Sequence, residues 1–208
     1  MNDHEYSLVG GMNRAKVGRY LSLIAAAVSA AIVFVLLTAV TWVQNLGLPA
    51  TITPSVMSLA GAGAVFAILY WIFDRHAWRW PLLNAAIKVP NLSGPWKCKG
   101  ISYKPDGTPQ YEWDGQVTID QSWDKIRVRL KTRQSGSDSI AAALVWEGSD
   151  GYRLLYNYRN HPRIDEVSLQ AHLGFCDLKF PNDLESAEGE YFNGHGRTTF
   201  GKMQLTRA

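Results

Sequence analysis

The most conspicuous absence in this sequence is charge. Between Tyr20 and Phe73 there is no Asp, Glu, Lys, Arg or His. Soluble domains carry charged residues throughout, so a charge-free stretch of this length excludes an ordinary soluble fold for this part of the chain. From about Val89 onward, charged residues return at the density of a soluble domain. The chain is therefore predicted to consist of two parts with opposite solvent preferences.

Cysteine is also scarce, and the common catalytic motifs are missing. Cys98 and Cys176 form no CxxC motif and are too few for a disulfide framework, so we expect two small, buried or half-buried residues. His161, His172 and His195 are scattered, without the spacing of metal ligands. The sequence has no P-loop, dinucleotide fingerprint or nucleophile signature. We therefore expect no enzyme activity, no metal and no cofactor.

The positive charge excess is confined to one part of the chain. The net charge is +3, from 21 Lys and Arg residues against 18 Asp and Glu residues. All of this excess lies before Val89, in the segments beside the apolar stretch, and the region from Pro90 onward is neutral. A neutral domain lacks the electrostatic footprint of a non-specific DNA or RNA binder. No nucleic-acid polymer is expected as a partner.

The charge-free stretch is long enough for two membrane-spanning helices. A helix needs roughly 20 residues to cross about 30 Å of hydrocarbon, which Tyr20–Val43 and Ser55–Phe73 each supply. The turn between them contains Gly47, Pro49 and Pro54, which break helices. The alternative for the first span is a cleaved signal peptide, which its length and the second span that follows disfavour. We expect a helical hairpin in the membrane.

The basic flanks predict the orientation of this hairpin. Lys and Arg residues lie before the first span and after the second, and the turn between the spans has none. The positive-inside rule then places both termini in the cytoplasm of a multi-pass protein of the bacterial inner membrane. We expect a cytoplasmic N-terminus over 1–19, two transmembrane helices over 20–73, an interfacial linker over 74–89 and a cytoplasmic ligand-sensing barrel over 90–208.

The region from Pro90 onward alternates apolar and polar residues, which is typical of β-strands. The segment YEWDGQVTIDQ, for example, places Val117 and Ile119 on one face and Thr118 and Asp120 on the other. Eight such strands are separated by turn sequences: 94–104, 111–121, 125–133, 138–147, 151–160, 166–176, 185–193 and 197–206. Eight antiparallel strands without helices predict an all-β, lipocalin-like barrel, which is wide enough to be filled or to hold one small ligand.

Polar residues at the ends of the inward rows favour a ligand at the barrel mouth. Buried polar groups without partners cost several kcal/mol, so their convergence indicates a polar ligand. Tyrosines can stack on a base, Asn and Thr can read its edge, and arginine can pair with a phosphate. The opposing interpretation is that these tyrosines are core residues whose hydroxyls reach water. The candidate ligand-binding residues are Gln121, Trp123, Thr132, Tyr156, Tyr158, Asn160, His172, Tyr191, Asn193, Arg197 and Thr199.

Two other patterns are interpreted as structural. The segment KIRVRLKTR turns a row of Lys and Arg outward, which we assign to a solvated strand face beside an acidic row and not to a phosphate site. Trp96 in the GPW segment and Arg207 near the C-terminus match the Trp-on-Arg closure of lipocalin-type barrels. Neither pattern is expected to bind a ligand.

Taken together, the sequence resembles the SMODS-associating, two-transmembrane, β-strand-rich effectors of CBASS anti-phage defence. The resemblance covers the whole chain and rests mainly on LLYNYRNHP, LQAHLG and GEYFNGHGRTTFG, with SGPWKCKG and DGQVTIDQSWDKIRVRLKT in support. It implies a barrel that binds a cyclic dinucleotide made by a partner nucleotidyltransferase, with Arg197 and its neighbours in the pocket. It also implies homo-oligomerisation, disruption of the inner-membrane bilayer and abortive infection. A membrane-anchored, lipocalin-like carrier of a small apolar ligand is the alternative, and a structural anchor with a filled barrel is a third possibility.

Overall fold

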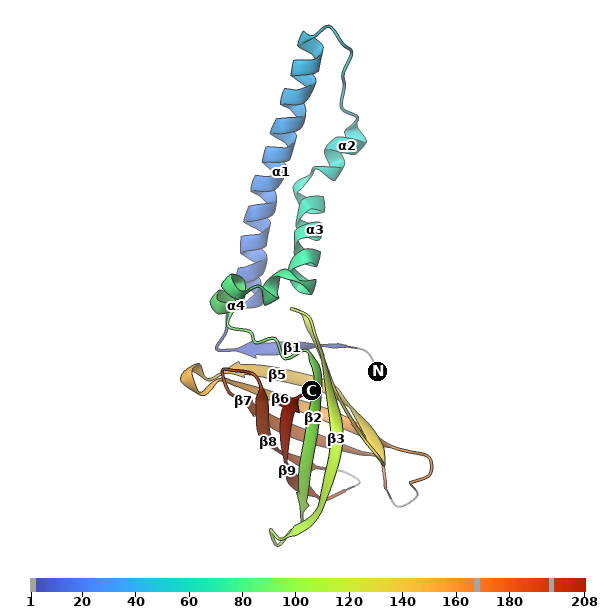
Figure 1. Ribbon diagram of the computed structural model, residues 1–208. Helices are drawn as coiled ribbons and strands as arrows, with labels where there is room; N and C mark the ends of the chain where they lie inside the picture. The colour runs from blue at the N-terminus through green and yellow to red at the C-terminus, as the bar shows by residue number, and fades with distance from the viewer. Residues whose placement is uncertain (1–2, 167–168, 195–196) are drawn as a thin grey trace. The chain divides into compact units, whose positions relative to one another are not determined.

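The computed structural model describes residues 3–166, 169–194 and 197–208. It divides the chain into two compact units: residues 12–78, which are helical, and residues 1–11 together with 79–208, which contain the strands (Figure 1). Each unit has its own core, and each is described separately below.

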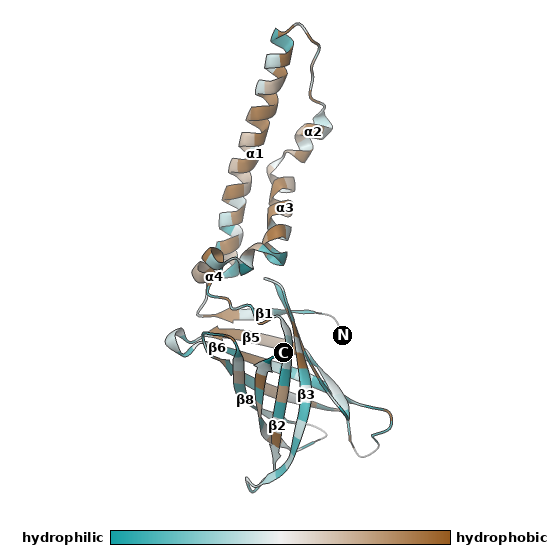
Figure 2. Ribbon diagram, in the orientation of Figure 1, coloured by the Kyte–Doolittle hydropathy of each residue, from teal (hydrophilic) through white to brown (hydrophobic). Residues whose placement is uncertain are grey.

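The helical unit contains one helix long and apolar enough to cross a membrane, among the residues described here. This helix, α1 (Arg14–Asn45), begins at Asn13, whose side chain accepts a hydrogen bond from the Ala15 amide at 2.7 Å. Its 32 residues correspond to about 48 Å, enough to include the whole first predicted span. Figure 2 shows α1 as predominantly hydrophobic along its length.

The second predicted span is not one continuous helix. Helix α2 (Pro54–Leu59) ends at Ala60, and α3 (Ala62–Arg75) begins after Gly61, whose backbone is extended. Glycine in a helix interior costs about 1 kcal/mol relative to alanine, which makes this the natural point for a break. The expectation of an unbroken helix over Ser55–Phe73 was therefore wrong.

Helices α1 and α3 pack side by side (Figure 1), and small residues form the contact of α1 with the break between α2 and α3. Ala25 and Ser29, one helical turn apart, are buried on α1, and Ala60 is buried opposite them. The Ser29 hydroxyl donates to the carbonyl of Ala60, at the break between α2 and α3. Small side chains at this spacing allow two helix backbones to approach closely.

Within the described residues, the strand unit is a ring of nine strands, one more than predicted. Their pairing order is β1-β4-β3-β2-β9-β8-β7-β6-β5, and the ring closes as a barrel. The strands are β1 (His4–Val9), β2 (Gly94–Tyr103), β3 (Pro109–Gln121), β4 (Lys125–Thr132), β5 (Ser135–Trp146), β6 (Tyr152–Pro162), β7 (His172–Phe180), β8 (Ser186–Asn193) and β9 (Phe200–Arg207). Short helices precede β2 (η1, Ala77–Arg79, and α4, Pro81–Ile87), and η2 (Gly148–Asp150) connects β5 to β6.

Two strand predictions need correction. The strand expected at 166–176 is β7, which begins only at His172 and continues to Phe180; residues 167–168 lie outside the described part of the chain. The additional strand, β1, comes from the segment that was predicted to be only a cytoplasmic tail. Its six residues alternate in burial, with Tyr6 fully buried, but the strand is short and lies far before its partners β4 and β5 in the sequence.

Strand β1 fills a gap in the barrel wall. Strands β4 and β5 pair directly over three residues only, from Arg129↔Asp138 to Lys131↔Gly136. Beyond this point β1 lies between them, antiparallel to β4 and parallel to β5. The Ser139 hydroxyl accepts the Val128 amide hydrogen bond at 2.9 Å where the direct pairing ends. The N-terminal segment is therefore part of the barrel.

One end of the barrel is filled and sealed. Trp96 is fully buried, its indole nitrogen donates to the Leu92 carbonyl at 3.0 Å, and Phe180 contacts its ring edge-on. The guanidinium of Arg207 lies 4.5 Å from the centre of the Trp96 ring and donates to three backbone carbonyls. The expected contact between Trp96 and Arg207 is thus confirmed, and its role is to close this end.

The outer face near the other end carries a row of aromatic side chains. Phe175, Phe192, Phe200 and Tyr103 are neighbours in register across β7, β8, β9 and β2. The rings of Phe175 and Phe192 stack at 5.4 Å, and those of Tyr103 and Phe200 stack at 6.2 Å. Cross-strand aromatic pairs of this kind stabilise a sheet by about 0.2–1 kcal/mol each. They hold together a part of the barrel whose interior is not filled.

The predicted basic row is a solvated strand face. Arg129 pairs with Asp120 on β3 at 2.7 Å, and Arg127 pairs with Asp138 on β5 at 2.6 Å. Both pairs lie on the outside of the barrel, where ion pairs contribute about 0–1 kcal/mol. The structural interpretation of this row is confirmed.

The position of β1 leads to a first prediction. Deleting residues 1–9 should lower the melting temperature of the barrel by about 5–10 °C, because it removes two strand ladders and the buried Tyr6. Near-ultraviolet circular dichroism of the full-length protein in detergent would follow barrel unfolding. A deletion ending at Asp3 is the control and should change nothing. Equal melting temperatures for both deletions would show that β1 does not close the barrel, and a fragment starting at Pro90 would then be complete.

Candidate functional site

The unfilled end of the barrel contains a cavity of about 460 Å³. Small-molecule sites have volumes of roughly 300–1,000 Å³, so a ligand of drug size or slightly larger fits. The cavity is lined from strands β3 to β9 and from the segments that follow β4 and precede β7. The lining residues are Tyr111, Glu112, Trp113, Asp114, Leu130, Thr132, Arg133, Gln134, Ser135, Ser137, Tyr156, Tyr158, Asn160, Leu169, His172, Tyr191, Asn193, Arg197 and Met203.

Three glycines keep this end hollow, because each leaves room for an aromatic ring to lie against the barrel wall. Each ring lies over a glycine that is its direct partner on the neighbouring strand: Gly100 with Trp113, Gly174 with Tyr158, and Gly201 with Tyr191. A Cβ atom at Gly174 would lie 2.3 Å from Cζ of Tyr158, closer than side chains tolerate. Any larger residue there would push the ring into the cavity, so these glycines set the cavity's volume.

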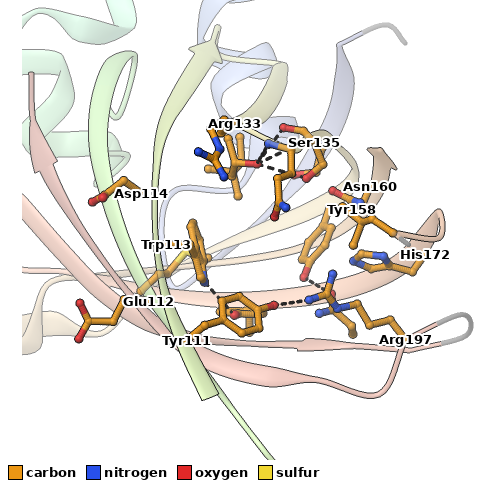
Figure 3. A pocket seen from close by; sticks show the side chains of 18 of the residues that line it. Tyr111, Glu112, Trp113, Asp114, Arg133, Ser135, Tyr158, Asn160, His172 and Arg197 are labelled. Carbon is orange, nitrogen blue, oxygen red and sulfur yellow. Dashed lines mark hydrogen bonds between the residues drawn. The ribbon is translucent and has the colours of Figure 1, made fainter. Parts of the chain in front are cut away.

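Arg197 lies at the cavity in a network of neutral groups. Its Nε donates to Thr199 Oγ1 at 3.1 Å, and its Nη2 donates to the Tyr111 hydroxyl. Thr199 Oγ1 also accepts from Asn193 Nδ2 at 2.7 Å, and Asn193 Oδ1 accepts from the Tyr158 hydroxyl at 2.7 Å. Figure 3 shows Arg197, Tyr111 and Tyr158 converging on one region of the cavity.

No ion pair neutralises the Arg197 guanidinium within the part of the chain that the structure describes. Two acids belong to the cavity lining, but Figure 3 shows Glu112 and Asp114 directed to the other side of β3 from the ring of Trp113. Among the described residues, Arg197 therefore does not pair with an acid on a neighbouring strand. A half-buried cation with neutral neighbours provides a site for an anion.

Three tyrosines and the histidine of the cavity are neutral at physiological pH. Burial raises the pKa of Tyr156, Tyr158 and Tyr191, so their hydroxyls stay protonated. Burial, with a smaller contribution from the Arg197 charge, lowers the pKa of His172 and favours its neutral form. His172 Nδ1 lies 2.9 Å from the Gln170 carbonyl, which can only accept, so the proton of the neutral ring is on Nδ1.

The two cysteines are inert neighbours of this site. Both thiols are free and buried, as predicted, and burial raises the pKa of Cys98 and of Cys176 to about 12. A thiol that remains protonated is a poor nucleophile and a poor metal ligand. Among the described residues, no three His, Cys, Asp or Glu side chains are grouped to hold a metal ion; His195 lies outside these residues.

The structure brings most of the candidate residues together. Thr199 lies directly behind the lining, where it holds Arg197 and Asn193. The candidate residues that line the cavity itself are Thr132, Tyr156, Tyr158, Asn160, His172, Tyr191, Asn193 and Arg197.

Gln121 and Trp123 do not reach the cavity. Gln121 lies near the sealed end, where its carboxamide accepts from the Leu92 amide at 2.9 Å and donates to the Pro90 carbonyl at 3.1 Å. Trp123 is buried and follows Gln121 in the chain. Gln121 ends β3 and Thr132 ends β4, but antiparallel neighbours place these ends at opposite ends of the barrel, since Gln121 pairs with Ile126 and Thr132 with Gly115.

Sequence reasoning missed several lining residues. Tyr111 and Trp113 were assigned to the inward face of their strand, but the choice of candidates did not extend to the start of that strand. A bulge between Ser139 and Ala141 shifts the alternation of β5 by one residue. The inward phase of Ala142 therefore does not predict that Ser137 also faces inward. The signal for Trp113 was available, because its inward phase placed an aromatic residue opposite a glycine.

Comparison with known proteins gives matches along the whole chain. Residues 15–79 match the family model described as "Cap15, TM helices", and residues 87–207 match "Cap15, cyclic dinucleotide receptor domain". The chain is 44% identical over 207 residues to the CD-NTase-associated protein 15 of Yersinia aleksiciae, covering 100% of this chain and 98% of that protein. The matches span both structural units.

The glycine seats generate a second prediction. Gly174→Ala should lower the free energy of unfolding by about 1–3 kcal/mol, because its methyl group overlaps the Tyr158 ring. Gly136→Ala, also in a strand, is the matched control: its Cβ would contact only a carbonyl oxygen at 3.6 Å. Denaturant unfolding of the two variants measures the difference. A Gly174→Ala protein as stable as Gly136→Ala would mean that Tyr158 moves without cost and that the seat is not rigid.

Proposed function

We propose that this chain, which belongs to the Cap15 family, is a membrane-bound CBASS effector whose barrel cavity binds a cyclic dinucleotide. The ligand is the product of a partner nucleotidyltransferase. Binding drives association of several copies, and the helical unit then disrupts the inner membrane and kills the infected cell. The barrel acts in this process as a receptor and not as a catalyst.

The observation that carries the proposal is the pairing of an unneutralised arginine with neutral aromatic and polar walls. A cyclic dinucleotide offers phosphodiester charges, flat bases and base edges. Arg197 can meet a phosphodiester with two charge-assisted hydrogen bonds, and its neighbours Tyr111 and Tyr158 can contribute hydroxyl groups. The rings of Trp113 and Tyr191 provide surfaces on which a base can stack.

The alternative of an apolar-ligand carrier has less support. A carrier of this kind requires an interior that remains apolar up to the mouth. Here the cavity lining includes two arginines, two carboxylates, an imidazole, three carboxamides and several hydroxyl groups. An apolar ligand would leave these groups without hydrogen-bond partners at a cost of about 1–3 kcal/mol for each buried one.

For the helical unit we propose two membrane crossings with both termini in the cytoplasm. Helix α1 forms the first crossing, and α2 with α3 forms the second, broken at Ala60–Gly61. Basic residues lie outside both crossings, and the connecting turn has none. The small-residue contact of Ala25 and Ser29 with Ala60 can be exchanged for contacts with another copy, which offers a route to oligomerisation.

The proposed phosphate contact yields a third prediction. Arg197→Ala should weaken cyclic dinucleotide binding roughly tenfold to a thousandfold, because it removes two charge-assisted hydrogen bonds that together contribute about 1.5–4 kcal/mol. Arg129→Ala is the control, since Arg129 lies on the outer face and pairs with Asp120. Calorimetry with the full-length protein in detergent measures both. Equal affinities for the two variants would place the phosphate elsewhere.

The proposed topology yields a fourth prediction. Leu48→Cys, in the exposed turn after α1, should react with a membrane-impermeant maleimide in cells whose outer membrane is permeabilised. Asp106→Cys, in the exposed β2–β3 turn of the barrel, should react only after lysis. The native thiols should not interfere, because both are buried. Labelling of Asp106→Cys without lysis, with Leu48→Cys protected, would reverse the topology.

A further inference from the structure

Three buried polar side chains form a continuous row on one wall of the cavity. Ser137 on β5, Asn160 on β6 and His172 on β7 are direct neighbours in register, Ser137 with Asn160 and Asn160 with His172. Their exposed fractions are 8%, 6% and 7%. All three line the cavity, and Figure 3 shows Asn160 and His172 beside each other on one side of it. We call this row the polar wall.

The central residue of the polar wall has an unsatisfied donor. Among the residues described, Asn160 Nδ2 is buried and has no hydrogen-bond partner. Leaving such a group unpaired costs about 1–3 kcal/mol, so native folds usually supply a partner. This fold does so for the buried carboxamide of Gln121, whose nitrogen and oxygen both have protein partners. Asn160 differs because it belongs to the cavity lining, where a bound ligand can supply the missing partner.

The two neighbours of Asn160 differ in what they offer. The Ser137 hydroxyl can donate a hydrogen bond from one side of Asn160. On the other side, His172 is neutral with its proton on Nδ1, so its Nε2 is an acceptor. With the Ser137 hydroxyl and Asn160 Nδ2 both donating, the wall presents two donors followed by one acceptor. A carbonyl oxygen can accept two hydrogen bonds, whereas a ring nitrogen accepts only one.

We propose that the polar wall reads the edge of one base of the ligand and selects a keto base, of the uracil or guanine type. The base carbonyl accepts from Asn160 Nδ2 and the Ser137 hydroxyl, and the adjacent ring N–H donates to His172 Nε2. An adenine edge presents an amino group where this carbonyl would lie. The amino group is a hydrogen-bond donor and would face the donors of Asn160 and Ser137. This assignment rests on the proposed function, since it names the base that accompanies the phosphate on Arg197.

The test is Asn160→Asp, which nearly preserves the shape and replaces the donor with an acceptor. Calorimetry on the full-length protein in detergent would compare cyclic di-UMP, cyclic di-GMP and cyclic di-AMP. The wild type should bind one of the keto ligands more tightly than cyclic di-AMP. The added charge repels all three ligands alike, so the informative quantity is the ratio of affinities. The affinity for the keto ligand divided by the affinity for cyclic di-AMP should fall at least tenfold in Asn160→Asp.

Two further variants keep the test decisive. Asn157→Asp, on the exposed face of the same strand, adds the same charge and should leave the affinity ratio unchanged. Ser137→Ala removes one donor without adding charge and should weaken only the keto ligand, by several-fold. It replaces Asn160→Asp as the deciding variant if the latter is not folded by circular dichroism.

The outcomes separate this inference from the proposed function. A uniform loss for all three ligands, or an unchanged ratio, places a phosphate or ribose at Asn160 and overturns the inference while the receptor function stands. Tighter wild-type binding of cyclic di-AMP than of either keto ligand overturns it as well. A wild type that binds none of the three, and no mixed dinucleotide that pairs a keto base with adenine, overturns both proposals.

Discussion

The barrel can close only because β1 bridges β4 and β5. After three residue pairs these strands separate, and each would otherwise present unpaired backbone amides and carbonyls to the interior. Strand β1 satisfies both edges at once, antiparallel to one and parallel to the other. Strand β1 enters near the sealed end, where His4 pairs with Ile126, whereas toward the open end β4 and β5 pair with each other directly. The strand therefore closes the wall beside the filled core and leaves the cavity end to the other eight strands.

The same strands build a filled end and a hollow end. At the sealed end large side chains meet across the interior, and Arg207 caps Trp96. At the open end each bulky ring lies flat over a glycine on the neighbouring strand and leaves the centre free. Part of the packing that is missing inside is replaced outside by the aromatic row across β7, β8, β9 and β2. The aromatic contacts on the outer face therefore stabilise this end of the barrel while the cavity stays free of side chains.

The open end also retains groups that the fold does not satisfy. The Arg197 guanidinium has no described carboxylate partner, and the Asn160 donor has no described partner at all. Such groups are costly in an empty receptor and favourable in an occupied one, so a ligand that satisfies them stabilises the occupied state. This coupling is the physical basis on which a receptor can convert binding into a change of state elsewhere in the molecule.

Local residue patterns determined much of this protein. Period-two alternation was sufficient to identify eight strands and the inward phase of Val117, Tyr156 and Met203, because a strand with one buried face cannot shift by one residue. The absence of charge identified the membrane segment. Most of the candidate residues line the cavity because they lie at the ends of inward-facing rows, and such row ends can be recognised from the local sequence alone.

Other features depended on contacts between residues distant in sequence, and only the tertiary structure decided them. Strand β1 is a short segment far in sequence from its partners, and it forms because β4 and β5 leave room for it. Gln121 and Thr132 both end inward rows, but antiparallel pairing sends them to opposite ends of the barrel. The partners of Arg197 and Asn160 likewise lie on other strands. Alternation specifies which face a side chain occupies, whereas register and closure specify what lies opposite it.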